Sequence, residues 1–212
     1  GLGGISVDGE EVRIGALSTL ADVRRSELLA SRFPVLGLTS RLMAAPSVAA
    51  MGTVGGNIAW GSPQADLLQP LLALDAAIDF SSGRTLPLED FFADAGKTAL
   101  APGELITAVR LRGADRRALY LRHSTRRLGD AQICSVAISG KREPGAGSRV
   151  VLGSCGPAPI VVDLPADIEV EVAVELVASR ATPRDDFRAT GAYRMKLVRV
   201  LTRRGLEHIR AN

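Results

Sequence analysis

Aromatic residues, cysteine and histidine are all scarce in this sequence, and each scarcity argues against a class of site. Phe, Trp and Tyr make up only 4% of the chain, so the dispersed basic residues lack the interleaved aromatics of a nucleic-acid surface. The two cysteines, Cys134 and Cys155, lie far apart in or beside apolar strand-like runs, which predicts reduced core residues. They lack the spacing of a zinc or iron–sulfur site, and only His123 and His208 supply imidazole, so no metal site is expected.

Long apolar runs are also missing, and none approaches the length of a membrane-spanning helix. No signal peptide opens the chain, which together with reduced cysteines predicts a cytoplasmic protein. The 212 residues are 46% hydrophobic and 23% charged, which is typical of a globular protein that packs Leu, Val, Ile and Ala. Because the net charge is only +3, we interpret the basic residues as a solvated face or as a rim that meets a partner protein.

Hydrophobic patterns predict an α+β chain in two parts, residues 1–113 and 114–212, with a boundary at Gly113-Ala114-Asp115. In the first part we expect strands at 12–16, 77–80, 84–88 and 105–111, and helices that start at Thr19, Ser26, Pro34 and Ser62. In the second part we expect strands near 118–122, 133–140 and 149–154, a turn at Pro144–Gly147, and helices over 167–179, 185–188 and 192–209. The last helix is expected to bury Tyr193, Leu197, Val200 and Leu201 and to turn Arg194 toward solvent.

The most distinctive stretch, residues 51–68, holds Gly52, Gly55 and Gly56 among small polar residues. Glycines permit a tight loop whose backbone N–H groups a ligand can approach closely. Ser62-Pro63 is typical of a helix start, so the loop is either a cradle for phosphate oxygens or a tight structural turn. Its spacing matches neither the dinucleotide fingerprint nor the P-loop, and spacing alone leaves both interpretations open.

The residues themselves are more specific than their spacing. Thr-Val-Gly-Gly-Asn-Ile at 53–58, followed by Ser-Pro-x-x-Asp-Leu at 62–67, resembles the second FAD-binding motif of the flavoprotein subunits of molybdenum hydroxylases. That family includes the medium subunit of aerobic carbon monoxide dehydrogenase and the FAD domain of xanthine dehydrogenase. The resemblance runs from residue 12 to residue 194. It implies a middle subdomain of the FAD-binding type-2 (PCMH-like) fold, then a C-terminal subdomain with a three-stranded antiparallel sheet and helices.

The resemblance also implies a set of cofactor-binding residues. FAD would contact this second motif, which here includes Thr53, Val54, Gly55, Gly56, Asn57 and Ser62. Asp66 would accept hydrogen bonds from ribose hydroxyls, although an Asp at a helix start is the alternative. Ile106 would border the cofactor or lie in a sheet core. Arg122 stands where relatives often have Lys near the flavin, and the alternative is a plain surface Arg.

Three departures from the family pattern stand out. The family's other cofactor motif, an Ala-Gly-Gly-x-Ser loop in an N-terminal βαβ segment, is absent, and the chain begins where that segment would end. We therefore expect FAD binding by this chain to be weakened or lost. Ala49-Ala50 stand where Arg-Asn is common. Trp60 replaces a small or polar residue, so it would pack over the cofactor, obstruct it, or serve as a core or interface residue.

No side chain is a convincing general acid, base or nucleophile, which suits a subunit whose cofactor performs the redox chemistry. The first hypothesis is an FAD-binding oxidoreductase subunit that works with a molybdenum-cofactor large subunit and a 2Fe-2S small subunit. Electrons would pass from the partner's clusters through FAD to NAD, quinone or oxygen, and a homo-oligomer of the chain is also considered. The second hypothesis is a remnant that binds no flavin and serves assembly. The third is an independent anion- or nucleotide-binding module.

Overall fold

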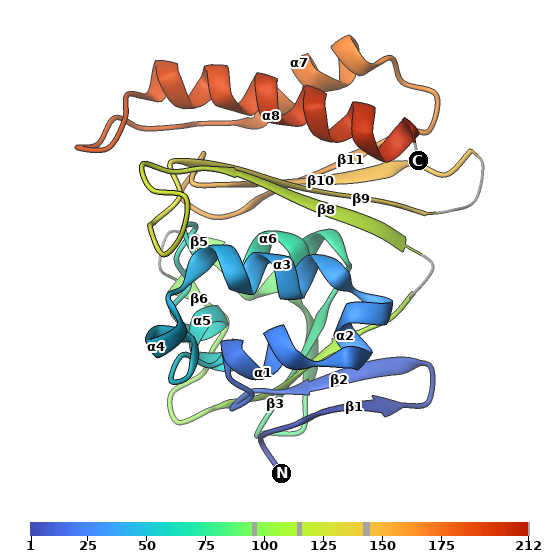
Figure 1. Cartoon of the computed structure of the whole chain (residues 1–212), viewed down its shortest axis with the longest axis vertical. Helices are drawn as coiled ribbons and strands as arrows, with labels where there is room; N and C mark the ends of the chain where they lie inside the picture. Colours follow the sequence, from blue (N-terminus) through green and yellow to red (C-terminus); the bar gives the residue numbers. More distant parts are fainter. Residues whose placement is uncertain (95–96, 114–115, 142–144, 212) are drawn as a thin grey trace.

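The computed structural model describes residues 1–94, 97–113, 116–141 and 145–211. Figure 1 shows four stacked layers, in which a sheet near the N-terminus is followed by a layer of helices, a second sheet and a pair of helices. The predicted α+β class is confirmed by this alternation of antiparallel sheets and helices.

The first sheet is antiparallel and has the strand order β1-β2-β7-β3-β4. Its strands are β1 (Ile5–Asp8), β2 (Glu11–Gly15), β7 (Ile106–Leu111), β3 (Ala77–Phe80) and β4 (Thr85–Pro87). Strand β7 is the central strand and joins the two hairpins of this sheet, because it pairs with β2 on one side and with β3 on the other. A 3-10 turn, η1 (Leu88–Phe91), and a short hairpin of β5 (Phe92–Asp94) and β6 (Lys97–Thr98) lie between β4 and β7 in sequence.

Six short helices form the layer between the two sheets. They are α1 (Leu20–Arg25), α2 (Glu27–Arg32), α3 (Pro34–Met43), α4 (Pro46–Ala49), α5 (Val54–Ala59) and α6 (Leu68–Ala73). Three predicted helix starts are confirmed by their caps: a capping box joins Thr19 and Asp22, Ser26 caps α2, and Pro34 opens α3.

The second sheet has the order β11-β10-β9-β8 and is antiparallel throughout. Its strands are β8 (Arg116–His123), β9 (Cys134–Lys141), β10 (Ser148–Gly153) and β11 (Ile160–Leu164). The three strands predicted for this part are confirmed, but their number is wrong because β11 adds a fourth. This short strand follows Pro157 and Pro159, and because prolines favour turns, the sequence around it indicated a loop. Pro144 of the predicted turn, and Ala114 and Asp115 of the predicted boundary, lie outside the described residues.

Two helices, α7 (Val170–Arg180) and α8 (Gly191–Ala211), cover the outer face of the second sheet (Figure 1). The helix predicted at 185–188 is not formed. The predicted orientation of α8 is wrong at Arg194, whose side chain is only 3% exposed. Its guanidinium binds the carbonyl of Ile133 and pairs with Asp186 at 2.7 Å, so these polar partners compensate its burial. Tyr193 and Val200, predicted to be buried, are exposed instead.

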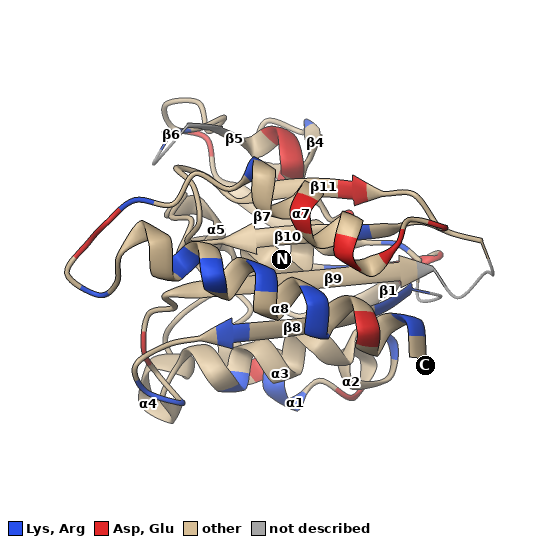
Figure 2. Ribbon diagram, turned by 90° about the horizontal axis from the view of Figure 1, so that it is seen from above, with Lys and Arg blue, Asp and Glu red and all other residues tan. Residues whose placement is uncertain are grey.

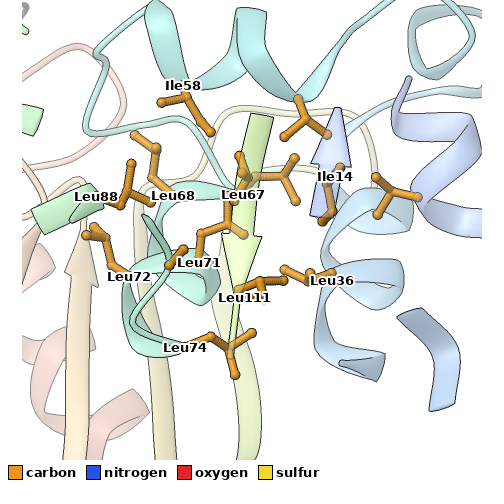
Figure 3. Close-up of a cluster of buried hydrophobic side chains, with 14 of the residues drawn as sticks. Ile14, Leu36, Ile58, Leu67, Leu68, Leu71, Leu72, Leu74, Leu88 and Leu111 are labelled. Atoms are coloured by element: carbon orange, nitrogen blue, oxygen red, sulfur yellow. The ribbon is translucent and has the colours of Figure 1, made fainter. Parts of the chain in front are cut away.

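The main core lies between the two sheets and is built around the leucines of α6 and the segment before it. Figure 3 shows Leu67, Leu68, Leu71 and Leu72 converging with residues of the first sheet such as Ile14. The same cluster includes Tyr120, Ala137 and Val151 from the second sheet. A second cluster fills the space between the second sheet and helices α7 and α8. One face of the second sheet therefore completes the core of the N-terminal half.

Candidate functional site

The glycine-rich stretch forms a helix rather than the loop predicted from sequence. Helix α5 spans Val54–Ala59, and Thr53 is its N-cap, with the side-chain Oγ1 accepting from the Gly56 amide at 3.1 Å. Two glycines normally disfavour a helix, so tertiary contacts must hold this one in place. Those contacts come from the segment after β2, which forms a bridge between Thr19 and Thr53.

The amides of this motif have hydrogen-bond acceptors within the chain. The pairs are Val54 N to Ser18 O at 3.0 Å, Gly55 N to Ala16 O at 2.8 Å, Gly56 N to Thr53 Oγ1 at 3.1 Å and Asn57 N to Thr53 O at 3.0 Å. The prediction that these main-chain amides stand free to face phosphate oxygens is therefore wrong. Their donors fix α5 against the first sheet.

The need for glycine at position 55 has a packing cause. A Cβ at Gly55 would stand 2.7 Å from the Ala16 Cβ and 2.9 Å from the Ala16 carbonyl oxygen. The helix can approach β2 this closely only without a side chain there. At Gly56, which is exposed, the nearest atom to an added Cβ is the Thr53 Oγ1 at 2.9 Å. Close approach of a chain segment, rather than of a ligand, explains Gly55.

Two side chains on this helix are available to a ligand. The Asn57 Oδ1 is buried and has no hydrogen-bond partner within the described part of the chain. The Thr53 hydroxyl uses its oxygen to accept from Gly56, which leaves its own proton free to be donated. Buried polar atoms without partners are rare in folded proteins, so the Asn57 oxygen marks a place where a hydrogen-bond donor is missing.

Ser62 does not start a helix, because α6 begins at Leu68 and the intervening residues form turns. The Ser62 Oγ accepts from the Gln64 amide at 3.2 Å, which stabilises the turn. Pro70 lies in the first turn of α6, where a missing N–H costs no intrahelical bond. Trp60, at the C-terminal end of α5, is 65% exposed and is therefore not the core residue that was one of its predicted roles.

Asp66 and Arg122, predicted separately as cofactor contacts, meet in a buried ion pair. The Arg122 Nη1 lies 2.8 Å from the Asp66 Oδ1, and both side chains are under 10% exposed, at 4% and 7%. The Tyr120 hydroxyl donates to the same oxygen at 2.8 Å. Neither a plain surface Arg nor a simple helix-start Asp describes this arrangement, so both alternatives raised by the sequence are wrong.

The guanidinium of Arg122 is held by four acceptors in all. They are the carbonyl oxygens of Leu42 at 3.3 Å and Asp130 at 2.6 Å, the Ser124 Oγ at 2.9 Å, and, through Nη1, the Asp66 carboxylate already described. Its Nε is buried without a partner within the described residues. The cluster thus offers one unsatisfied donor in addition to a fixed positive charge.

Burial dominates the titration of this cluster. Removal from water raises the pKa of the Asp66 carboxyl above its ordinary value, and the Arg122 charge and the Tyr120 hydrogen bond offset part of that rise. Burial, followed by the charge of Asp66, raises the pKa of the Tyr120 phenol well above its ordinary value. Tyr120 consequently stays protonated at physiological pH and serves as a donor.

Sequence reasoning missed Tyr120 and its second partner, Gln132, whose Oε1 lies 3.0 Å from the phenol oxygen. A signal was present, because the alternation of β8 places Ala118, Tyr120 and Arg122 on one face. Ile106 lies on β7, beneath α5, and is 8% exposed within the main core. It is the sheet-core residue that the sequence allowed as its alternative role.

Within the described residues no group of His, Cys, Asp or Glu is arranged to hold a metal ion. No helix of the described structure is both long enough and apolar enough to cross a membrane.

Solved structures show what class of protein has this fold. The crystal structure of the cyanide-inactivated Cu,Mo-CO dehydrogenase contains a chain that matches 99% of this one with a TM-score of 0.90 and 29% identity, over 79% of its own length. A chain of the carbon monoxide dehydrogenase from Hydrogenophaga pseudoflava matches 99% of this one with a TM-score of 0.92 and 25% identity, over 78% of its length. The fold is that of a chain found in carbon monoxide dehydrogenases, which are oxidoreductases.

Sequence comparisons then define the family. Residues 1–111 match the model described as the FAD binding domain in molybdopterin dehydrogenase. The chain is 30% identical to the carbon monoxide dehydrogenase medium chain of Afipia carboxidovorans, covering 98% of this chain and 77% of the relative. It is 29% identical to the glyceraldehyde dehydrogenase medium chain of Sulfolobus acidocaldarius, covering 93% and 75%. The chain belongs to the FAD-binding subunits of the molybdenum hydroxylase family.

The predicted family, cofactor and class of function are thereby confirmed: this is an oxidoreductase subunit with FAD as its cofactor and a role in electron transfer. The described residues fit such a cofactor through side chains. The unpaired Asn57 oxygen needs a donor, the unpaired Arg122 Nε needs an acceptor, and FAD carries groups of both kinds.

Proposed function

We propose that Thr53, Asn57, Asp66 and Arg122 hold the FAD through which this subunit transfers electrons. The observation that carries the proposal is that two of the buried atoms without partners among the described residues, the Asn57 Oδ1 and the Arg122 Nε, belong to residues that the family resemblance places beside the cofactor. An unsatisfied buried group costs about 1–3 kcal/mol, and a bound ligand that satisfies it recovers that cost. The two atoms therefore favour a ligand with both donors and acceptors over a simple anion.

Each residue has its own role in this proposal. Asn57 accepts a hydrogen bond and Thr53 donates one, while Val54, Gly55 and Gly56 supply the backbone that seats α5 on the sheet. Ser62 contributes a tight turn beside the site, and Ile106 supports α5 from the sheet core beneath it.

FAD, when bound, supplies the redox chemistry, since it accepts electrons and passes them on. The chain contributes charge and position. Arg122 keeps a positive charge near the cofactor because Asp66, Ser124 and backbone carbonyls fix its guanidinium, and a fixed cation stabilises negative charge at low cost in reorganisation. Tyr120 holds the Asp66 oxygen in place and, with its raised pKa, keeps its proton.

We further propose that the chain works with a molybdenum-cofactor large subunit and a 2Fe-2S small subunit. The relatives named as medium chains support a multi-subunit assembly, and the described residues offer no metal site of their own. Electrons would then arrive from the partner's iron–sulfur clusters and leave to an acceptor. A cytoplasmic location and a division into functional units at 1–113 and 114–212 complete the proposal. The family model, which ends at residue 111, supports this division.

The test is a titration of the full chain with FAD, in which flavin fluorescence measures binding. Asn57→Leu should weaken FAD binding about tenfold or more, which corresponds to about 1.4 kcal/mol. Without FAD the same variant should be as stable as the wild type or more stable, because it removes an unpaired buried oxygen. Gln64→Leu is the matched control, an amide in the neighbouring turn whose Oε1 binds Arg188, and it should leave FAD affinity unchanged.

These opposite signs separate a ligand contact from a structural residue. Equal FAD affinity in Asn57→Leu and the wild type would refute the site. If the wild-type chain itself bound no FAD, the chain would instead be the structural or assembly module that remains as the alternative function.

A further inference from the structure

Strand β8 is one of the two edge strands of the second sheet, and β11 is the other. Strand β8 pairs with β9 along its whole length, and within the described residues no other strand pairs with it. In an antiparallel pair, every second residue of an edge strand directs its N–H and C=O away from its neighbour. Strand β8, with eight residues, is longer than most edge strands that proteins leave uncovered.

A groove of about 630 Å³ runs along this edge between two helices. One wall is the N-terminal half of α3, with Pro34, Val35 and Leu38, and Leu38 is 47% exposed. The other wall is α8, with Leu201, Arg204 and His208. Figure 1 shows β8 between α3 and α8, at the junction of the two halves of the chain.

The two walls differ in chemistry. The α3 wall is apolar apart from Arg122 of β8, whose buried guanidinium is paired with Asp66. The α8 wall carries the exposed Arg204, and Lys and Arg residues recur along this helix in Figure 2. Arg199 and Arg203 of the same helix are neutralised by Glu175 and Glu171 of α7, so their charge is directed away from the groove. Arg204 has no such carboxylate partner among the described residues.

A strand added beside β8 would present alternate side chains to the two walls, because strand side chains point to opposite faces. On β8 itself, Ala118 and Tyr120 pack with the main core on the α3 side, and Leu119 and Leu121 pack with the second cluster on the α8 side. An added strand would keep this alternation. Its matching pattern is apolar residues toward α3 and acidic residues toward α8.

We propose that the β8 edge is a docking site for an extended segment of another protein in which apolar and acidic residues alternate. Backbone hydrogen bonds to β8 would give affinity, and the two walls would give specificity, as in other cases of strand addition. A second copy of this chain fits less well. Pairing through β8 of both copies would place the two α8 walls side by side, so that Arg204 of one copy would face Arg204 of the other and their positive charges would repel.

The probe is a fluorescent capped peptide in which Val and Glu alternate, titrated into the full chain and followed by anisotropy. The same design with Lys in place of Glu is the first control, and a version with alternate backbone nitrogens methylated is the second. We expect binding of the Val–Glu peptide alone, with protection of the 116–123 amides from hydrogen exchange.

Variants of the two walls test the geometry. Leu38→Asp and Arg204→Glu should each weaken peptide binding about tenfold or more, equivalent to about 1.4 kcal/mol. Val172→Asp and Arg180→Glu on α7 are the matched controls, exposed residues outside the groove that should bind the peptide as the wild type does. Circular dichroism and unfolding of each variant verify that it is folded.

Three outcomes would overturn the proposal. The first is equal binding of the Val–Lys peptide, and the second is equal binding of the N-methylated peptide. The third is that the chain dimerises as its concentration rises, that Leu38→Asp abolishes the dimer, and that the peptide does not compete with dimer formation. This result would assign the edge to a second copy.

Discussion

The Arg122 Nη1 and the Asp66 Oδ1 lie 2.8 Å apart, and this buried contact joins the second sheet to the turn before α6. Residues of the two predicted halves of the chain are therefore linked by an ion pair rather than by apolar contacts alone. An ion pair removed from water is tolerated only while both members are present and hydrogen-bonded.

Arg122→Met should accordingly destabilise the chain by about 3–5 kcal/mol at neutral pH, because it leaves the Asp66 carboxylate buried without its cation. The deficit should shrink as the pH falls. Burial already raises the pKa of Asp66, loss of Arg122 raises it further, and protonation removes the unpaired charge. Urea unfolding at several pH values measures both effects. The double variant Asp66→Asn/Arg122→Met should cost less than the sum of the single changes, and strict additivity would contradict the pairing.

Gly55→Ala should destabilise the chain by about 1–3 kcal/mol, since the new Cβ would stand 2.7 Å from the Ala16 Cβ. Gly37→Ala, in α3, is the control: its nearest atoms would lie at 3.7 and 3.8 Å, so the change should stabilise the helix by about 0.5–1 kcal/mol. Thermal unfolding monitored by circular dichroism gives both values. Opposite signs are required, and a stabilised Gly55→Ala variant would show that α5 does not sit as closely on β2 as described.

The stability of the chain should fall between pH about 4.5 and about 2 partly because of Glu104. Hydrogen bonds from Arg84 and Ser82 lower the pKa of this carboxyl from 4.5 to about 2. A group whose pKa is depressed by folding contributes stability that is present above its unfolded pKa and lost as the pH falls through its folded pKa. Glu104→Gln should flatten this part of the profile of unfolding free energy against pH. Glu10→Gln, an exposed residue in the β1–β2 turn, should leave the profile unchanged.

The thiols of Cys134 and Cys155 should react slowly with Ellman's reagent in the folded chain and rapidly after unfolding in urea. Their Sγ atoms lie 3.3 Å apart in the core, and the hydrogen bond between them, followed by burial, raises the pKa of Cys134 well above its ordinary value. The thiolate is the reactive form, so a raised pKa and burial both slow the reaction. Cys134→Ala should show the same contrast for the remaining thiol. Prompt release of two equivalents from the native protein would contradict the buried position.

Much of the fold follows from local signals that the sequence displays openly. Thr19 and Ser26 are caps whose side chains bind the next turn, and Pro34 suits the first position of a helix, so these starts were predictable. Four strands of the first sheet, β2, β3, β4 and β7, show the same local clarity, whereas β1 was not predicted. Element β11 escaped prediction because its few residues follow a proline-rich turn.

The site was less predictable because its contacts are not local. Gly55 and Gly56 predict a loop by propensity, and contacts with the distant segment of Ala16, Ser18 and Thr19 hold this stretch as α5. The family resemblance predicted Asp66 and Arg122 as separate cofactor contacts, but the 2.8 Å contact between them depends on how two distant segments pack. Tyr120 was visible only as one apolar position on a strand, and its hydroxyl gained a role from where Asp66 lies.

The leucines of α6 share one hydrophobic core with Tyr120, Ala137 and Val151 of the second sheet. Expression of one half without the other would expose the hydrophobic core surface between them to water, which is unfavourable. The first half expressed alone is therefore expected to aggregate. Exchange of segments among related enzymes is expected to preserve this junction intact.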